Sequence, residues 1–292
     1  MSSRPSDRIR LAIPNKGRIA EPIAALIEKS GLHINGGGVR QLIAKTVDPH
    51  IEILYVRPID IPEYVAQGVA DLGITGLDMV AERGSVVENL LDLGMGKARL
   101  VIAVPDESRY TVAADLAGAK IATEFPGITR SFFSERGIDV AIVSVSGACE
   151  AAPQLGIADA IVDLTSSGTT LETHHLRILA DVFSSSTWLI ANPASAGKHR
   201  DKIDEITLAL ESVVRAKGQC YLMMNISRDS LEEIRAILPG LAGPTVMDVA
   251  SDQNLVAVHA VVAEERIYQL INQVKRAGAT DILVMDVQRM IP

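Results

Sequence analysis

The sequence has few of the residues that mark several common classes of protein. It contains only two cysteines, Cys149 and Cys220, so a disulfide framework is excluded and both are expected to be buried thiols. Its four Phe, five Tyr and one Trp leave few platforms on which single-stranded nucleic acid could stack. No uncharged apolar run reaches the length of about 18 residues that a membrane-spanning helix needs. Segment 1–12 lacks the apolar region of a signal peptide, which predicts a cytoplasmic protein.

Basic residues are also fewer than acidic residues. The formal net charge is −8 and the isoelectric point is about 5.3, which disfavours binding to a long polyanion such as nucleic acid. A small anionic ligand in one pocket is still compatible with this balance. The acidity is concentrated in residues 106–184, whose formal charge is −6, while residues 1–105 are neutral.

The 292 residues predict two or three domains, and most of the chain alternates apolar runs of strand length with helical patterns. Such alternation is typical of parallel sheets with helices on both faces. Strands are predicted at Ile9–Pro14, Ile51–Val56, Leu72–Thr75, Leu100–Val104, Lys120–Thr123, Val140–Val145 and Ala160–Leu164. Helices are predicted at Ile19–Ser30, Ile59–Gln67, Thr129–Arg136 and Gly147–Leu155.

One doubly wound sheet could hold residues 1–220, but two smaller α/β lobes fit better. Asp106–Asp115 is a polar break, and Leu176–Asn192 is long enough to carry the chain back to the first lobe. The predicted domains are therefore a first lobe (1–105 plus 185–220), a second lobe (106–184) and a C-terminal domain (221–292).

The last 72 residues predict a separate β-α-β-β-α-β module of the ferredoxin-like arrangement. Its strands are expected at Tyr221–Ile226, Val246–Val249, Val256–Val262 and Ile282–Val287. One helix is expected to run from a cap at Asp229 or Ser230 to Leu238, and the other over Glu264–Arg276. Nothing in it suggests catalysis, so ligand-binding regulation or subunit assembly is its expected use.

The segment that carries chemistry follows the strand Ala160–Leu164. The loop Ser166–Leu171 offers four hydroxyls and Gly168, and it opens a helix whose first N–H groups lack intrahelical partners. This combination indicates a phosphate cradle, although a Ser/Thr-rich turn that only caps the helix fits the loop equally well. Asp163, at the end of the strand, suits sugar hydroxyls or a bound Mg²⁺. Sugar and phosphate together indicate a phosphoribose ligand.

These residues carry a resemblance to a known family. The run from Glu150 through Gly156 and Asp163 to Leu171 resembles the signature of ATP phosphoribosyltransferase, the first enzyme of histidine biosynthesis. Pro14–Gly17, Asp71–Gly76 and the pair Pro244-Thr245 support it. The C-terminal module makes the chain similar to the long form, which carries its own regulatory domain.

The resemblance implies two periplasmic-binding-protein-like α/β lobes around a cleft, followed by a ferredoxin-like regulatory domain. It also implies transfer of the 5-phosphoribosyl group of phosphoribosyl pyrophosphate (PRPP) to N1 of ATP, with release of pyrophosphate. Mg²⁺ is the implied cofactor, histidine the feedback inhibitor, and dimers and hexamers of the chain the expected assemblies.

The resemblance also assigns roles to individual residues. Catalytic roles fall to Asp163, Glu150 and Lys16, and the PRPP loop comprises Ser166, Ser167, Gly168, Thr169, Thr170 and Leu171. The ATP side comprises Gly17, Arg18, Arg57, Asp71, Gly73, Thr75 and Arg99. Histidine would contact Asn225, Leu241, Thr245 and Asp281, and Mg²⁺ would lie near Asp159 and Asp163, held mostly through pyrophosphate.

Two other classes of function compete with this interpretation. Two lobes around a cleft also describe solute-binding and effector-sensing proteins, but the chain shows neither a signal peptide nor a basic helix-turn-helix. A nicotinamide-dependent dehydrogenase would need the glycine fingerprint after its first strand, and that fingerprint is absent.

Overall fold

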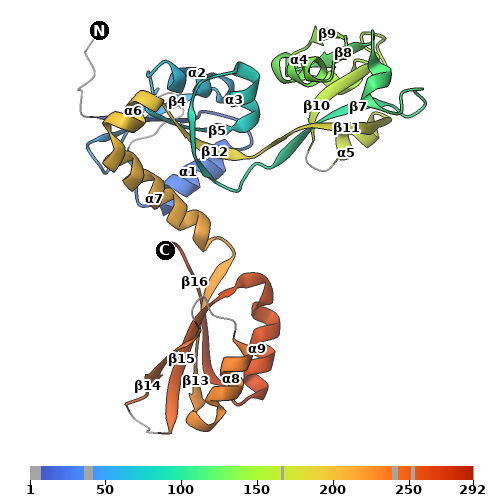
Figure 1. Ribbon diagram of the computed structural model, residues 1–292. Coiled ribbons are helices and arrows are strands. Elements are labelled where there is room, and N and C mark those ends of the chain that lie inside the picture. The colour runs from blue at the N-terminus through green and yellow to red at the C-terminus, as the bar shows by residue number, and fades with distance from the viewer. Residues whose placement is uncertain (1–7, 36–41, 166–167, 239–242, 251–253, 292) are drawn as a thin grey trace. The chain divides into compact units, whose positions relative to one another are not determined.

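The computed structural model describes residues 8–35, 42–165, 168–238, 243–250 and 254–291. The chain divides into two compact units, Met1–Thr207 and Leu208–Pro292 (Figure 1). Among the described residues, no helix is long and apolar enough to cross a membrane.

The first sheet of unit 1 has seven strands in the order β2-β3-β4-β1-β5-β12-β6. Its centre is parallel, because β1 pairs in parallel with both β4 and β5. The strands are β1 Ile9–Pro14, β2 Ile34–Asn35, β3 Ile43–Thr46, β4 Ile51–Val56, β5 Leu72–Gly76, β6 Glu88–Asp92 and β12 Thr187–Ala191. The helices between them are α1 Ala20–Lys29, α2 Ile61–Ala66 and α3 Leu77–Arg83. This sheet and these helices are called lobe I.

The second sheet of unit 1 has five strands in the order β11-β7-β10-β8-β9. The strands are β7 Ala98–Pro105, β8 Lys120–Thr123, β9 Ala141–Ser144, β10 Ala160–Thr165 and β11 Leu176–Ser185. Helices α4 Pro126–Glu135 and α5 Thr169–Thr173 belong to this part, called lobe II. Its core packs Phe125, Ile128, Phe132 and Phe133 against the buried faces of β7, β8 and β10.

The prediction of two lobes is confirmed. The chain enters lobe II along β7 and leaves it along β11, and Ser186 alone separates β11 from β12 of the first sheet. The sequence-based boundary placed residues 98–105 in the first lobe, whereas β7 pairs with β10 and β11 in the second. An apolar run shows that a strand exists but not which sheet it joins.

One predicted helix is wrong. Gly147–Leu155 contains only the short 3-10 helix Cys149–Ala151, followed by turns. Gly147 and Ala148 both have positive φ, 85° and 49°, which an α-helix does not allow. Pro153 then removes a backbone donor.

Unit 2 has the predicted β-α-β-β-α-β order. Its elements are β13 Gln219–Ser227, α8 Leu231–Ile237, β14 Thr245–Asp248, β15 Leu255–Ala263, α9 Ile267–Arg276 and β16 Thr280–Asp286. The antiparallel sheet has the order β14-β15-β13-β16, and α8 and α9 cover one face (Figure 1). Alternate residues of β13 are buried against Ile234, Leu270 and Val274 of the helices. Helices α6 Pro193–Lys198 and α7 Arg200–Ala216 precede β13 in the chain.

Candidate active site

Strand β10 lies between β7 and β8 and delivers the predicted phosphate loop at its carboxyl end. The Gly168 N–H donates to Thr165 Oγ1 at 2.9 Å, and Gly168 is the N-cap residue of α5. Leu171 is buried in the core beneath, so it anchors the loop, while Thr169 and Thr170 are exposed. Ser166 and Ser167 lie outside the described residues.

Gly168 has a φ of +85°, and no atom of the described residues lies within 4 Å of an added Cβ. The left-handed backbone, which a side chain would strain, is therefore one reason for glycine here. Close approach of a ligand to this residue stays a prediction.

Asp163 is a half-buried carboxylate two residues before the end of β10. Its pKa is raised to about 6, chiefly by burial and also by the negative charges of Glu124 and Glu150, against the lowering effect of the Leu164 N–H. That N–H donates to Asp163 Oδ1 at 2.7 Å. Because its surroundings disfavour the charged form, the Asp163 carboxylate is suited to binding a cation or several hydroxyl donors.

Glu124 is a residue that the sequence reasoning missed. Val162 of β10 pairs with Thr123 of β8, so Asp163 and Glu124 are the next residues on adjacent parallel strands. The Glu124 carboxylate accepts the N–H of Gly147. Its position directly after a predicted strand was a usable signal, because ligands of α/β sheets bind at the carboxyl ends of strands.

Glu150 approaches the same group of carboxylates from the 3-10 helix Cys149–Ala151. Its Oε1 lies 3.9 Å from Nε2 of His174, which follows α5. Cys149 beside it is an unreactive thiol, since burial raises its pKa to about 12 and its Sγ donates to the Ala122 carbonyl at 3.3 Å. Both cysteines are free and buried, as predicted.

A cavity of about 440 Å³ lies beside the loop. Arg99 pairs with Thr165 across β7 and β10, and both line this cavity together with Lys97. Its remaining walls come from the strand ends that join the two lobes, at Asp92, Ala98, Ser184, Ser185 and Ser186. Arg99 Nη1 also lies 2.9 Å from Asp181 Oδ1 on an exposed surface. Sequence reasoning had assigned Arg99 to the ATP side and had missed Lys97.

In lobe I, Lys16, Gly17 and Arg18 are exposed just after the carboxyl end of β1. The φ of Gly17 is 97°, so the turn needs glycine. Arg57 follows the carboxyl end of β4, where its Nε donates to Asp60 Oδ2 at 2.7 Å. These cations share one edge of the sheet, because β1 and β4 are parallel.

The predicted nucleotide wall Asp71–Gly76 has mainly structural contacts. The buried Asp71 carboxylate accepts the Arg10 N–H and the Ser195 hydroxyl, both at 2.7 Å, at the amino end of β5. A Cβ at Gly73 would stand 2.6 Å from Ile61, so the glycine allows α2 to pack on β5. Thr75 is fully buried and donates to the Pro58 carbonyl at 3.1 Å. Asp71 and Gly73 therefore have structural roles in lobe I.

Asp159 lies at the opposite end of β10 from the loop, where its Oδ2 accepts the Lys120 N–H at 2.8 Å. It does not lie beside Asp163. Within the described part of the chain, no group of three or more His, Cys, Asp or Glu residues could hold a metal ion.

In unit 2, two of the predicted effector residues are in contact. Asn225 Nδ2 donates to Asp281 Oδ2 at 3.0 Å, and Asp281 has a left-handed φ of 49°. Thr245 is exposed on β14, opposite His259 of β15, and therefore lies two strands away from Asn225 on β13. Leu241 lies outside the described residues.

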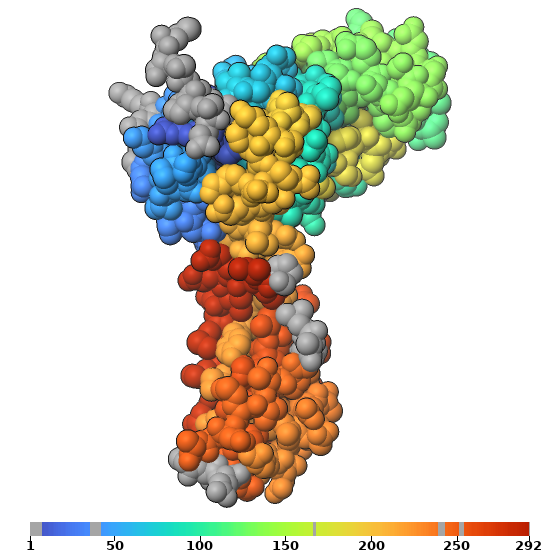
Figure 2. Space-filling model, turned by 60° about the vertical axis from the view of Figure 1, so that its left-hand side comes forward, coloured from blue at the N-terminus to red at the C-terminus, as the bar shows by residue number. Residues whose placement is uncertain are grey.

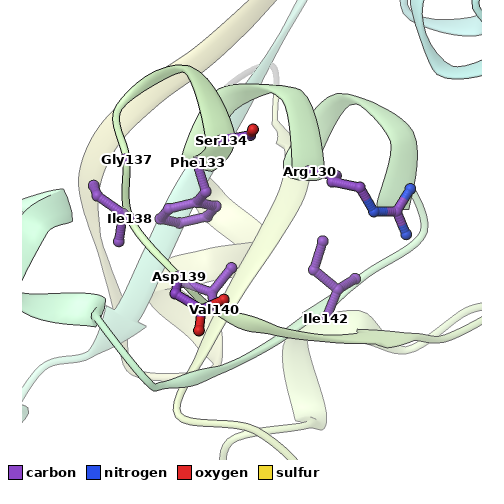
Figure 3. Close-up of a pocket in the computed structure, with 8 residues that line it drawn as sticks. All are labelled: Arg130, Phe133, Ser134, Gly137, Ile138, Asp139, Val140 and Ile142. Atoms are coloured by element: carbon purple, nitrogen blue, oxygen red, sulfur yellow. The ribbon is translucent and has the colours of Figure 1, made fainter.

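A second hollow, of about 570 Å³, lies between α4 and the edge strand β9 (Figure 3). Figure 3 shows Arg130 on one side of it and Phe133 and Asp139 on the other. None of the predicted site residues lines this hollow.

The fold and the site define a two-lobed α/β protein with a loop and carboxylates suited to a phosphorylated sugar, joined to a β-α-β-β-α-β domain. Residues 57–212 match the family model of ATP phosphoribosyltransferase, and residues 216–289 match that of the HisG C-terminal domain. The chain belongs to the ATP phosphoribosyltransferase family, in its long form, and its activity is the first step of histidine biosynthesis.

Relatives support this assignment along the whole chain. The ATP phosphoribosyltransferase of Methanococcoides burtonii is 55% identical over 284 residues, which cover 97% of this chain and 100% of the relative. That of Methanosarcina barkeri is 52% identical, with the same coverage. A chain of the solved ATP phosphoribosyl transferase (HisG:HisZ) complex from Thermotoga maritima is 30% identical, with a TM-score of 0.64 over 71% of this chain and 98% of that one.

Proposed function

We propose that the loop Ser166–Leu171 holds the 5-phosphate of PRPP and that Asp163 and Glu150 accept its ribose hydroxyls. The observation that carries this proposal is the placement of Asp163 near the carboxyl end of β10, two residues before the strand ends and the chain continues through Gly168 into α5. The exposed Thr169 and Thr170 present hydroxyls and the first N–H groups of that helix. Lys97 and Arg99, which line the adjoining cavity, supply the positive charge that the acidic segment 106–184 lacks.

The transfer requires that the two substrates be positioned and that developing charges be stabilised, and it does not require a nucleophilic side chain. The lone pair of adenine N1 forms a bond to the anomeric carbon, while the bond from that carbon to the pyrophosphate oxygen breaks and its electron pair leaves with pyrophosphate. Carboxylates on the sugar side stabilise the positive charge that develops on the ring, and cationic side chains stabilise the departing pyrophosphate.

We propose Mg²⁺ as the cofactor. Mg²⁺ prefers oxygen ligands and commonly binds through one or two carboxylates plus substrate phosphates, so Asp163 and Glu150 fit a metal that is held largely by pyrophosphate. When bound, the metal would neutralise charge on the leaving group. The exposed Glu124 holds the Gly147 turn that leads to Glu150.

We propose that ATP binds at the carboxyl edge of lobe I. Lys16 and Arg18 are exposed after β1, and the ion pairs found among the described residues include neither of them. Both side chains are therefore available to the triphosphate. Arg57 lies on the same edge, although its guanidinium is engaged by Asp60.

We propose that unit 2 binds histidine and that the chain assembles with copies of itself in the cytoplasm, as dimers and hexamers. Asp281 and Asn225 offer an acceptor and a donor for the two ends of an amino acid. The exposed apolar side chains Met247, Leu283 and Met285 on β14 and β16 support self-association. Residues of β16 are visible on the surface of this unit (Figure 2).

Calorimetric titration of PRPP with Mg²⁺ tests the PRPP site. Thr170→Val, which removes one exposed hydroxyl, is expected to weaken binding about 10- to 100-fold, the value of one hydrogen bond to a charged group. Thr173→Val is the matched control, because the Thr173 hydroxyl donates to the Thr169 carbonyl within the helix. Equal affinities of wild type and Thr170→Val would contradict this role for the loop.

A further inference from the structure

Helix α4 of lobe II begins without a capping residue of its own. Its N-cap is Phe125, whose side chain makes no cap hydrogen bond, and Pro126 follows at the first helical position. The Thr129 N–H reaches the Phe125 carbonyl, which leaves the N–H groups of Gly127 and Ile128 to be satisfied from elsewhere.

Glu82 of lobe I supplies the missing cap. Its Oε1 accepts the Gly127 N–H at 2.9 Å and its Oε2 accepts the Ile128 N–H at 3.0 Å. Glu82 stands in the last turn of α3, where a carboxylate is unfavourable for its own helix dipole. Its negative charge is instead favourable beside the N-terminus of α4 in the other lobe.

The surrounding contacts belong to the same face of α3. Met79 packs against the core of lobe II, and Asp78 Oδ1 accepts the hydroxyl of Ser185, the last residue of β11, at 2.6 Å. At Gly127, an added Cβ would stand 2.6 Å from the Glu82 backbone oxygen. Glycine at this position thus allows the two helices to approach closely.

We propose that Glu82 is a positioning residue that holds lobe I against lobe II by capping α4. This inference rests on the proposed division of ATP and PRPP between the two lobes. Helix α4 starts two residues after Glu124, at the sheet edge that carries Asp163, so the cap acts beside the PRPP site. While Glu82 caps α4, the distance between the ATP edge of lobe I and the loop of lobe II stays fixed.

Four variants of the full chain test the proposal. Glu82→Ala removes the cap, Glu82→Gln keeps its shape and one acceptor oxygen, and Gly127→Ala forces the helices apart while the carboxylate stays intact. Glu135→Gln is the matched control, because Glu135 is an exposed residue at the other end of α4. Should Glu82→Ala not fold, Glu82→Gln and Gly127→Ala test the same contact.

Kinetics give the first readout. If the capped arrangement falls to roughly a tenth of the population, KM for PRPP rises about tenfold while kcat stays within about twofold, because saturating substrate restores the competent state. A residue that matters only for stability would reduce the amount of active protein and leave KM unchanged. The proposal predicts a smaller rise for Glu82→Gln than for Glu82→Ala, and no change for Glu135→Gln.

The second readout needs no activity, so it separates failure of this proposal from failure of the proposed function. Spin labels at Glu21→Cys and Glu107→Cys, both exposed positions, report the distance between the lobes in ligand-free protein diluted with unlabelled chain. One narrow distance distribution is expected for the parent and for Glu135→Gln, and a broader one for Glu82→Ala and Gly127→Ala. An unchanged distribution in Glu82→Ala, or an equal effect of Glu135→Gln, would overturn the proposal.

Discussion

Arg99 and Thr165 are partners on the antiparallel strands β7 and β10, and both line the cavity beside the phosphate loop. The pairing matters because lobe II is acidic, with a formal charge of −6 over residues 106–184. We therefore expect the proposed phosphate site to depend on backbone N–H groups, hydroxyls and a few cations from the segments that enter the lobe. Arg99 stands at the start of one such segment.

Replacing Arg99 with Met is expected to raise KM for PRPP about 10- to 100-fold, the effect of losing one charge-assisted hydrogen bond to an anionic substrate. Steady-state kinetics at saturating ATP measure it. Asp181→Asn is the control, because Asp181 pairs with Arg99 on the exposed side and its loss leaves the guanidinium in place. An unchanged KM for PRPP in Arg99→Met would remove Arg99 from the site.

Asp163→Asn is expected to change how stability depends on pH. Burial raises the pKa of Asp163 to about 6, so the folded chain holds this proton more tightly than the unfolded chain does. Its stabilising contribution is complete below about pH 4 and is lost as the pH rises through about 6, by about 1–3 kcal/mol for this half-buried group.

Urea unfolding of wild type and Asp163→Asn between pH 4 and pH 7 measures this effect. As the pH rises, the free energy of unfolding of wild type should fall relative to that of the variant. The difference between the two should become constant above about pH 6. Asp181→Asn serves as an exposed control. A constant difference in the free energy of unfolding between pH 4 and pH 7 would show that folding does not shift the pKa of Asp163.

Gly168→Ala is expected to destabilise the chain by about 1 kcal/mol, since alanine does not readily adopt a φ of +85°. It should also weaken PRPP binding, because the Gly168 backbone sets the direction of the loop N–H groups. Gly197→Ala in α6 is the control, and it should be neutral or stabilising, because alanine favours a helix and no atom lies within 4 Å of its Cβ. Thermal unfolding distinguishes the two, and equal effects would contradict the strain argument.

Asp281→Asn is expected to weaken histidine inhibition about tenfold while kcat without histidine stays unchanged. Asparagine tolerates the left-handed φ of 49° and still accepts the Asn225 amide, but it removes the charge that would hold an ammonium group. Inhibition curves at fixed substrate give the comparison. Retention of full inhibition would place the effector elsewhere.

Much of the fold could be predicted from the sequence because buried strands are apolar and helices have their own period. Ile9–Pro14 and Lys120–Thr123 have the predicted bounds. The prediction of a helix over residues 147–155 is wrong because the composition of the segment does not reveal its two residues of positive φ. The phosphate loop was predicted from local residues alone and stays a prediction, whereas the contact of Glu82 with Gly127 joins two lobes and has no local signal.

We expect this chain to transfer phosphoribosyl from PRPP to ATP with the loop after β10 as its PRPP site. Incubation with ATP, PRPP and Mg²⁺, followed by mass spectrometry of the nucleotide and assay of pyrophosphate, tests it most directly. The expected product is an adduct of ATP and one phosphoribosyl group, with one pyrophosphate released per adduct, and Asp163→Asn should form it slowly. Absence of an adduct under conditions in which both ligands bind would contradict it.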